Sequence, residues 1–90
     1  MTNIDEQIKA LGYELNEINP VIGYMIYENK SANHEVTIEW NDDIKECLIF
    51  SNSLTKDKDW FGDLYESPMA LDVQEAELFI AKIKEMRNES

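Results

Sequence analysis

The residues best suited to chemistry are few: one histidine, His34, and one cysteine, Cys47. His34 could serve as a general base, but no serine, cysteine or acid forms a recognisable catalytic motif with it, and we expect an exposed residue in or beside a turn. Cys47 stands next to Leu48 and Ile49 in an acidic and apolar stretch. A reactive thiol needs an electropositive, accessible setting, so we expect a buried core cysteine. The sequence therefore predicts no catalytic residues and no enzyme.

A cluster of acids around Gly62 is the best candidate for a metal site. Asp57, Asp59 and Asp63, together with this glycine, follow part of a calcium-loop pattern. The pattern fails at Pro68, which stands where the loop needs a bidentate glutamate. One histidine and one cysteine cannot build a zinc site, and three glycines provide no phosphate-binding loop. We therefore expect neither a metal nor any other cofactor.

Charge is the strongest signal of the chain. Its 90 residues carry 19 acidic and 8 basic side chains, for a formal net charge of −11, in a composition that is 43% hydrophobic and 10% aromatic. A direct nucleic-acid binder needs a basic footprint, anionic lipid surfaces repel such a protein, and a disordered acidic tail lacks these aromatics. We expect one folded domain, residues 1–90, with a strongly negative surface.

Such a surface suits basic protein partners, because it attracts positively charged grooves and accelerates association with them. A specific form of this hypothesis is nucleic-acid mimicry, in which carboxylates stand where phosphates would. The alternative is a solvated acidic surface that only maintains solubility. The aromatic residues near Gly62 could anchor a partner or fold back to cover the sheet. The candidate partner-binding residues are Glu35, Glu39, Asp42, Asp43, Asp57, Asp59, Trp60, Phe61 and Asp63.

Two helices are predicted, one at each end of the chain. Thr2 or Asn3 can cap the first, which carries Ile4, Ile8 and Leu11 on one face and ends at Gly12. Asp72 caps the second and forms an acidic capping box with Glu75, and Leu71 and Ala76 occupy the staple positions. Its predicted apolar face consists of Ala76, Phe79, Ile80, Ile83 and Met86.

Three strands are predicted between the helices. Val21 to Glu28 is rich in β-formers and apolar on both faces, whereas Glu35 to Trp40 alternates between apolar and polar residues. Ile44 to Phe50 is the third strand. Residues 13–20 could start another strand, but Pro20 interrupts it. Residues 51–70 show no clean period, and we allow a short helix or a fourth strand near Trp60 to Tyr65.

The expected fold is α+β, a three-stranded antiparallel meander with both helices packed on one face, in the order α-β-β-β-α. The apolar residues on the opposite face would then include some of Met25, Tyr27, Cys47 and Ile49. A second copy of the chain could cover them, giving a homodimer.

Three segments carry a resemblance to known proteins. Ile4 to Glu14 reads IDEQIKALGYE, Tyr24 to Glu28 ends in YE, and Leu71 to Met86 reads LDVQEAELFIAKIKEM. In these the chain resembles small uncharacterised proteins of bacteriophages and prophages of low-GC Gram-positive bacteria. The resemblance covers about half of the sequence, implies a phage-associated α+β fold and supplies no active site. In size and charge the chain is also similar to phage DNA-mimic inhibitors, without a shared motif.

The sequence therefore predicts a non-enzymatic accessory protein that binds a basic, and in its narrower form nucleic-acid-binding, surface of a host protein. The rival hypothesis is a self-associating structural module whose acidity is incidental. The polar, acidic N-terminus is unlike a signal peptide, and a single cysteine suits a reducing compartment. We accordingly expect the protein in the cytoplasm.

Overall fold

The computed structural model describes residues 3–40 and 46–89 of the chain. Its elements, in chain order, are α1 (Ile4–Ala10), β1 (Glu14–Asn19), β2 (Tyr24–Asn29), β3 (His34–Trp40), β4 (Cys47–Lys58), β5 (Leu64–Pro68) and α2 (Val73–Glu89). The predicted α+β class is confirmed. The predicted strand count is wrong, because the sheet has five strands where three were expected.

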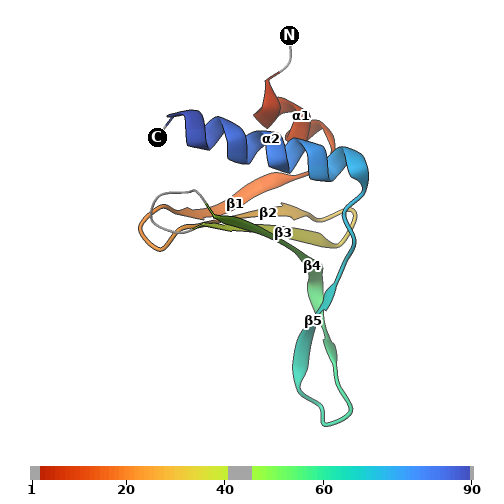
Figure 1. The fold of residues 1–90 in the computed structure, drawn as a ribbon. Coiled ribbons are helices and arrows are strands. Elements are labelled where there is room, and N and C mark those ends of the chain that lie inside the picture. The colour runs from red at the N-terminus through yellow and green to blue at the C-terminus, as the bar shows by residue number, and fades with distance from the viewer. Residues whose placement is uncertain (1–2, 41–45, 90) are drawn as a thin grey trace.

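The sheet is an antiparallel meander in which every strand pairs with its neighbour in sequence, in the order β1-β2-β3-β4-β5. Both helices lie over the same face of the sheet, as expected, and contact each other (Figure 1). The β1 and β5 strands form the two edges. The face opposite the helices is covered by no other element among the described residues.

The core lies between the helix layer and β2 and β3. Alternate residues of these strands point toward the helices and are buried, which is the period of two expected for a half-covered sheet. The buried apolar residues are Ile8, Tyr13, Met25, Tyr27, Val36, Ile38, Phe79 and Ile83. Met25 and Tyr27 thus face the helices, and Cys47 and Ile49 pack against the same core. The expectation that these four residues could lie on the uncovered face is wrong.

The helix ends follow the sequence closely. Asn3 caps α1 by accepting a hydrogen bond from the backbone N–H of Glu6 at 2.8 Å, and Gly12, with φ of 102°, follows the helix in a left-handed conformation. At the start of α2 the capping box is complete. The N–H of Glu75 donates to Asp72, and the N–H of Asp72 donates back to the Glu75 carboxylate.

One predicted strand begins too early. Val21 and Ile22 belong to the exposed turn before β2 and not to the strand itself. Asn19 orders this turn, because its side chain accepts hydrogen bonds from the N–H groups of both residues. Gly23 then takes a φ of 97°, and its carbonyl accepts a hydrogen bond from the N–H of Trp40 at 2.9 Å. The turn chemistry therefore prevailed over the β-propensity of two exposed apolar side chains.

Residues 51–70 differ most from the prediction. The strand that was expected to end at Phe50 continues as β4 to Lys58, and β5 pairs with it, so most of the supposed irregular segment is a hairpin. We call residues 56–66 of this hairpin the arm. The arm projects from the sheet on the side opposite the helices (Figure 1). The base of the hairpin is braced by Asn33, whose side chain bonds to both the hydroxyl and the N–H of Thr55.

Candidate functional site

The uncovered face of the sheet presents apolar side chains surrounded by acids. We call it the open sheet face and define it by the outward-pointing residues Glu17, Tyr24, Ile26, Glu28, Glu35, Thr37, Glu39, Leu48 and Phe50. Leu48 and Phe50 are both exposed although they are large and apolar. A hydrogen bond of 2.8 Å from the Tyr24 hydroxyl to Glu17 confirms that these two side chains share the face.

Like charges stand side by side on this face. Glu28 pairs directly with Glu35 across β2 and β3. Directly opposed like charges destabilise a sheet. The pKa of Glu35 is raised above that of an ordinary glutamate, first by partial burial and then by the negative charges of Glu66 and Glu28. Repulsion between carboxylates is thus the second cause of the raised pKa, after burial, and Lys56 offsets part of it.

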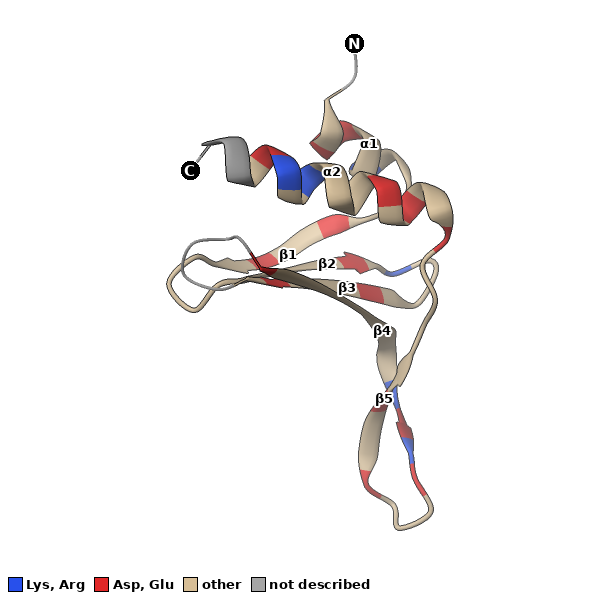
Figure 2. Cartoon of the chain, viewed as in Figure 1, with Lys and Arg blue, Asp and Glu red and all other residues tan. Residues whose placement is uncertain are grey.

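No ion pair within the described residues neutralises these acids, although the positive charge of Lys56 on the arm partly offsets the negative charge of Glu35. Within residues 3–40 and 46–86 the ion pairs join Lys82 to Asp5 and Glu85, and Glu75 lies 3.9 Å from His34. All of these contacts lie on the helix side of the sheet. Figure 2 shows acidic positions along β1, β2 and β3 and also on both helices, with basic positions on α2, in the turn between β2 and β3 and along the arm. The expected outward direction of Glu35 and Glu39 is confirmed.

The tip of the arm is aromatic and ordered. Trp60 is 95% exposed and Phe61 is 86% exposed, so neither side chain folds back to cover the sheet. The turn is held by Asp59, whose carboxylate accepts hydrogen bonds from the N–H groups of Phe61 at 2.8 Å and Asp63 at 2.9 Å. Gly62 completes the turn with φ of 84°. The tip therefore presents two large apolar side chains on a backbone fixed by its own hydrogen bonds.

The charge of the arm is mixed. Asp57, Asp59 and Asp63 are exposed there as expected, but Lys56 and Lys58 alternate with them along β4 (Figure 2). Lysines thus interrupt the acids along the arm, whereas β2 and β3, which carry Glu28, Glu35 and Glu39, contain no lysine. Asp42 and Asp43, which were also predicted to contact a partner, lie outside the described residues.

The expected exposure of His34 is wrong, because its side chain is buried at the start of β3. Its Nδ1 lies 2.7 Å from the hydroxyl of Tyr13, and its Nε2 hydrogen-bonds to the hydroxyl of Ser51. The Tyr13 hydroxyl also donates to the carboxylate of Glu75. The contacts thus form one hydrogen-bond network that runs from Ser51 to His34, then to Tyr13 and finally to Glu75.

This network joins both layers of the protein. It links the segment after α1 to β3, β4 and the first turn of α2. Burial, followed by the hydrogen bond to Glu75 and by the negative charges of Glu75 and Asp72, raises the pKa of Tyr13 far above its ordinary value. Both ring nitrogens of His34 are engaged inside the protein. The arrangement satisfies buried polar groups, as stability requires.

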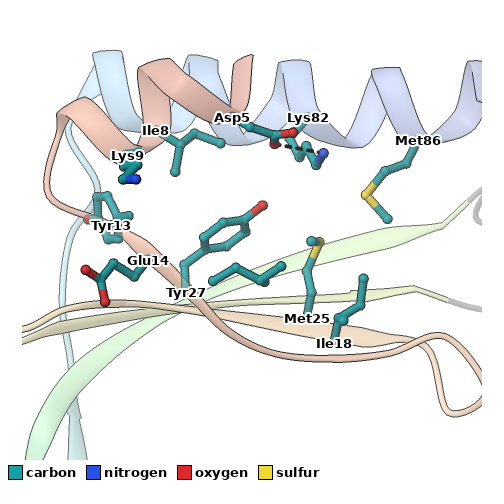
Figure 3. A pocket seen from close by; sticks show the side chains of 11 residues that line it. Asp5, Ile8, Lys9, Tyr13, Glu14, Ile18, Met25, Tyr27, Lys82 and Met86 are labelled. Atoms are coloured by element: carbon teal, nitrogen blue, oxygen red, sulfur yellow. Dashed lines mark ion pairs between the residues drawn. The ribbon is translucent and has the colours of Figure 1, made fainter. Parts of the chain in front are cut away.

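A cavity of about 550 Å³ opens between the helix layer and the edge strand β1 (Figure 3). Its walls are mainly apolar and include Ile8, Ile18, Met25 and Met86. Tyr27 reaches into it from β2, and Lys82 from α2. No local sequence motif marks this cavity, because its lining comes from four elements.

Among the described residues, no three side chains of histidine, cysteine, aspartate or glutamate are grouped in a way that could hold a metal ion. Neither described helix offers an apolar stretch of the length needed to cross a lipid bilayer.

Comparison with known proteins gives no match: no family model, no curated protein and no solved structure is similar enough to the chain to assign it to a family.

Proposed function

We propose that the protein is a non-enzymatic binding protein whose open sheet face docks on a basic surface of another protein. The observation that carries the proposal is the composition of this face. Carboxylates of β2 and β3 share this face with the exposed side chains of Leu48 and Phe50: Glu39 is in register with Leu48, and Glu28 with Glu35. Apolar centres with polar rims are typical of protein interfaces. A cationic partner would relieve the repulsion between Glu28 and Glu35, which gives it an advantage over neutral partners.

The arm supports the same assignment. It descends on the side of the open sheet face, so a partner that lies against this face also meets the arm (Figure 1). Trp60 and Phe61 are residue types that anchor interfaces, and their turn is already ordered in the unbound protein. An ordered anchor loses little conformational entropy on binding. We therefore assign these two residues to the contact, together with Glu35 and Glu39.

The narrower form of the proposal is that the partner surface itself binds nucleic acid, with the carboxylates in place of phosphates. The size and charge of the chain support it by analogy with phage DNA-mimic inhibitors. The resemblance of three segments to phage proteins supports an accessory role in infected or lysogenic cells, and hence a cytoplasmic location.

A capture experiment with three baits tests the proposal. Wild-type protein is compared with a double variant of the open sheet face, Glu35→Gln with Glu39→Gln. The matched control, Glu6→Gln with Glu77→Gln, removes the same charge from exposed positions on the two helices. Each bait is presented to cell lysate at low salt and at about 0.5 M NaCl, where charge interactions beyond a few ångströms are screened. Captured proteins are identified by mass spectrometry.

The proposal requires basic proteins that the wild type and the control capture at low salt, and that the sheet variant and high salt both release. Added duplex DNA should displace the same proteins if the partner surface binds nucleic acid. Equal capture by the two double variants, or capture that ignores salt, would exclude a role for the charged face.

Self-association is the competing function. A face-to-face dimer would cover Leu48 and Phe50, but it would also bring the acids of one open sheet face against those of the other. The repulsion makes this arrangement unfavourable at neutral pH. Light scattering at low and high salt decides between the two, since a dimer that persists at low salt contradicts the proposed binding mode.

A further inference from the structure

The cavity between α1, α2 and the edge strand β1 is independent of the open sheet face, because it lies on the helix side of the sheet (Figure 3). A volume of about 550 Å³ is within the range of small-molecule sites. Met25 and Met86 face each other across it, and methionine side chains adapt readily to the shape of a bound molecule. The site thus has the size and the walls expected for an apolar ligand.

The hydroxyl of Tyr27 offers a ligand in the cavity a specific polar contact. Tyr27 is only 4% exposed, and its hydroxyl is directed toward the cavity from the β2 side. Among the described residues no hydrogen bond is formed by this hydroxyl, and its oxygen stays accessible from the cavity. A tyrosine combines an apolar ring with a polar end that can hydrogen-bond. A ligand with an oxygen atom at one end would supply a partner for this hydroxyl while its apolar part filled the space along Ile18 and Met25.

The charges around the cavity determine the charge of the ligand. The ammonium of Lys82 is already paired with Asp5 at 2.9 Å and with Glu85 at 3.5 Å. The other two charged residues of the lining, Lys9 and Glu14, are of opposite sign. The lining thus holds two acids, Asp5 and Glu14, and two cations, Lys9 and Lys82, so it offers a carboxylate ligand no net positive charge, in a chain whose net charge is −11. A neutral ligand does not require such a charge.

Two macromolecular occupants fit less well. An added β-strand needs a regular edge, but the register of β1 shifts between Leu15 and Glu17, beside the cavity, and such bulges oppose edge pairing. A second copy of the chain would place the acids of one β1 strand, Glu14 and Glu17, near those of the other.

We infer that the cavity beside β1 binds a neutral, mainly aliphatic small molecule whose single polar oxygen hydrogen-bonds to the hydroxyl of Tyr27. The site is separate from the proposed protein-binding face, so either assignment can fail without the other.

Octanol is a suitable probe and octanoate its charged counterpart, with binding measured by displacement of the neutral fluorophore N-phenylnaphthylamine. Ile18 is 51% exposed at the cavity wall, so Ile18→Trp should fill the site without disturbing the core. Ile22→Trp, in an exposed turn outside the lining, is the matched control. Tyr27→Phe removes only the hydroxyl. The methyl resonances of Met25 and Met86 report occupancy in the wild type without any substitution.

We expect saturable octanol binding in the wild type and in Ile22→Trp, shifts of both methionine methyl resonances, and loss of binding in Ile18→Trp. Tyr27→Phe should weaken octanol binding by roughly 3- to 10-fold, the effect of one hydrogen bond, and octanoate should bind more weakly than octanol. The inference is overturned if no saturable binding occurs, if Tyr27→Phe binds as tightly as the wild type, if octanoate binds more tightly than octanol, or if light scattering shows that a second copy occupies this edge.

Discussion

The hydroxyl of Tyr13 lies 2.7 Å from Nδ1 of His34, so a residue that follows the first helix is fixed to the first residue of the central strand. The same hydroxyl donates to Glu75 in the first turn of α2. A single oxygen atom therefore connects the beginning, the middle and the end of the chain.

Replacing Tyr13 with phenylalanine should destabilise the protein by about 1–3 kcal/mol, because His34 and Glu75 would lose a buried hydrogen-bond partner while the ring packing was retained. Urea unfolding monitored by circular dichroism measures this. Tyr65→Phe, on the exposed arm, is the control and should change stability by less than about 0.5 kcal/mol. Equal stabilities for the two variants would contradict a structural role for the network.

The raised pKa of Tyr13 also predicts how stability depends on alkaline pH. The unfolded chain releases the phenol proton near its ordinary pKa of 10.0, whereas the folded protein retains the proton to higher pH. The stability contributed by this group is complete below that pKa and is lost as the pH rises above it. Wild-type stability should therefore fall more steeply above about pH 10 than that of Tyr13→Phe. Parallel curves would mean that Tyr13 is not the group responsible.

Neutralising Glu35 should stabilise the isolated protein. Because its pKa is raised in the folded state, the protein loses stability as Glu35 ionises with rising pH, and Glu35→Gln removes that loss. We expect a gain of about 0.2–1 kcal/mol near neutral pH, the size of one unfavourable cross-strand pair, which should shrink in acid. Thermal unfolding across this pH range provides the measurement. Glu77→Gln on α2 should change the stability less. A larger gain in stability from Glu77→Gln than from Glu35→Gln would contradict the assignment of the repulsion to Glu35.

The cap of α2 can be tested by two substitutions at one position. Asp72→Ala removes the acceptor for the N–H of Glu75 and should cost about 0.5–2 kcal/mol, whereas Asp72→Asn keeps an acceptor and should cost less. Denaturant midpoints of the two variants give the comparison. Identical midpoints would show that the side-chain hydrogen bond contributes nothing.

Alanine substitutions at two glycines can distinguish the cost of backbone strain from that of steric clash. Gly23 and Gly62 both have positive φ, so an alanine at either position costs about 1–2 kcal/mol of strain. The added Cβ at Gly23 would lie 2.4 Å from the carbonyl oxygen of Trp40, while at Gly62 it would meet nothing within 4 Å. Gly23→Ala should therefore be clearly the more destabilising in chemical denaturation. The reverse order would contradict the described turn before β2.

The features that could be predicted from the sequence are those set by neighbouring residues. The caps at Asn3 and Asp72 depend on partners three positions away, and the alternation of Val36, Ile38 and Trp40 is visible within one strand. The spacing of Ile80 predicts a position on the buried face of α2, but its side chain is exposed. The face of α2 that packs on the sheet is therefore narrower than the sequence indicates.

The features that could not be predicted depend on distant partners. His34 reads as a turn residue, and its burial follows from Tyr13 and Ser51, which are 21 and 17 positions away. The second half of β4 lies largely in the arm, which has few neighbours to pack against. Its residues are mostly polar, so the sequence there lacks the apolar alternation that marks a strand. Its pairing is set by the turn at Asp59, whose hydrogen bonds a composition count does not reveal.

The neighbour-to-neighbour order of the strands bears on how the chain folds. Each hairpin closes a short loop, so the sheet can assemble by successive local steps with little entropic cost. The docking of α2 onto α1 closes the longest loop in the protein, and Phe79 and Ile83 gain their contacts only then. We therefore expect helix docking to be the slow step of refolding. Before it occurs, the nascent sheet has both faces in water, and the surplus of negative charge keeps such intermediates apart from one another.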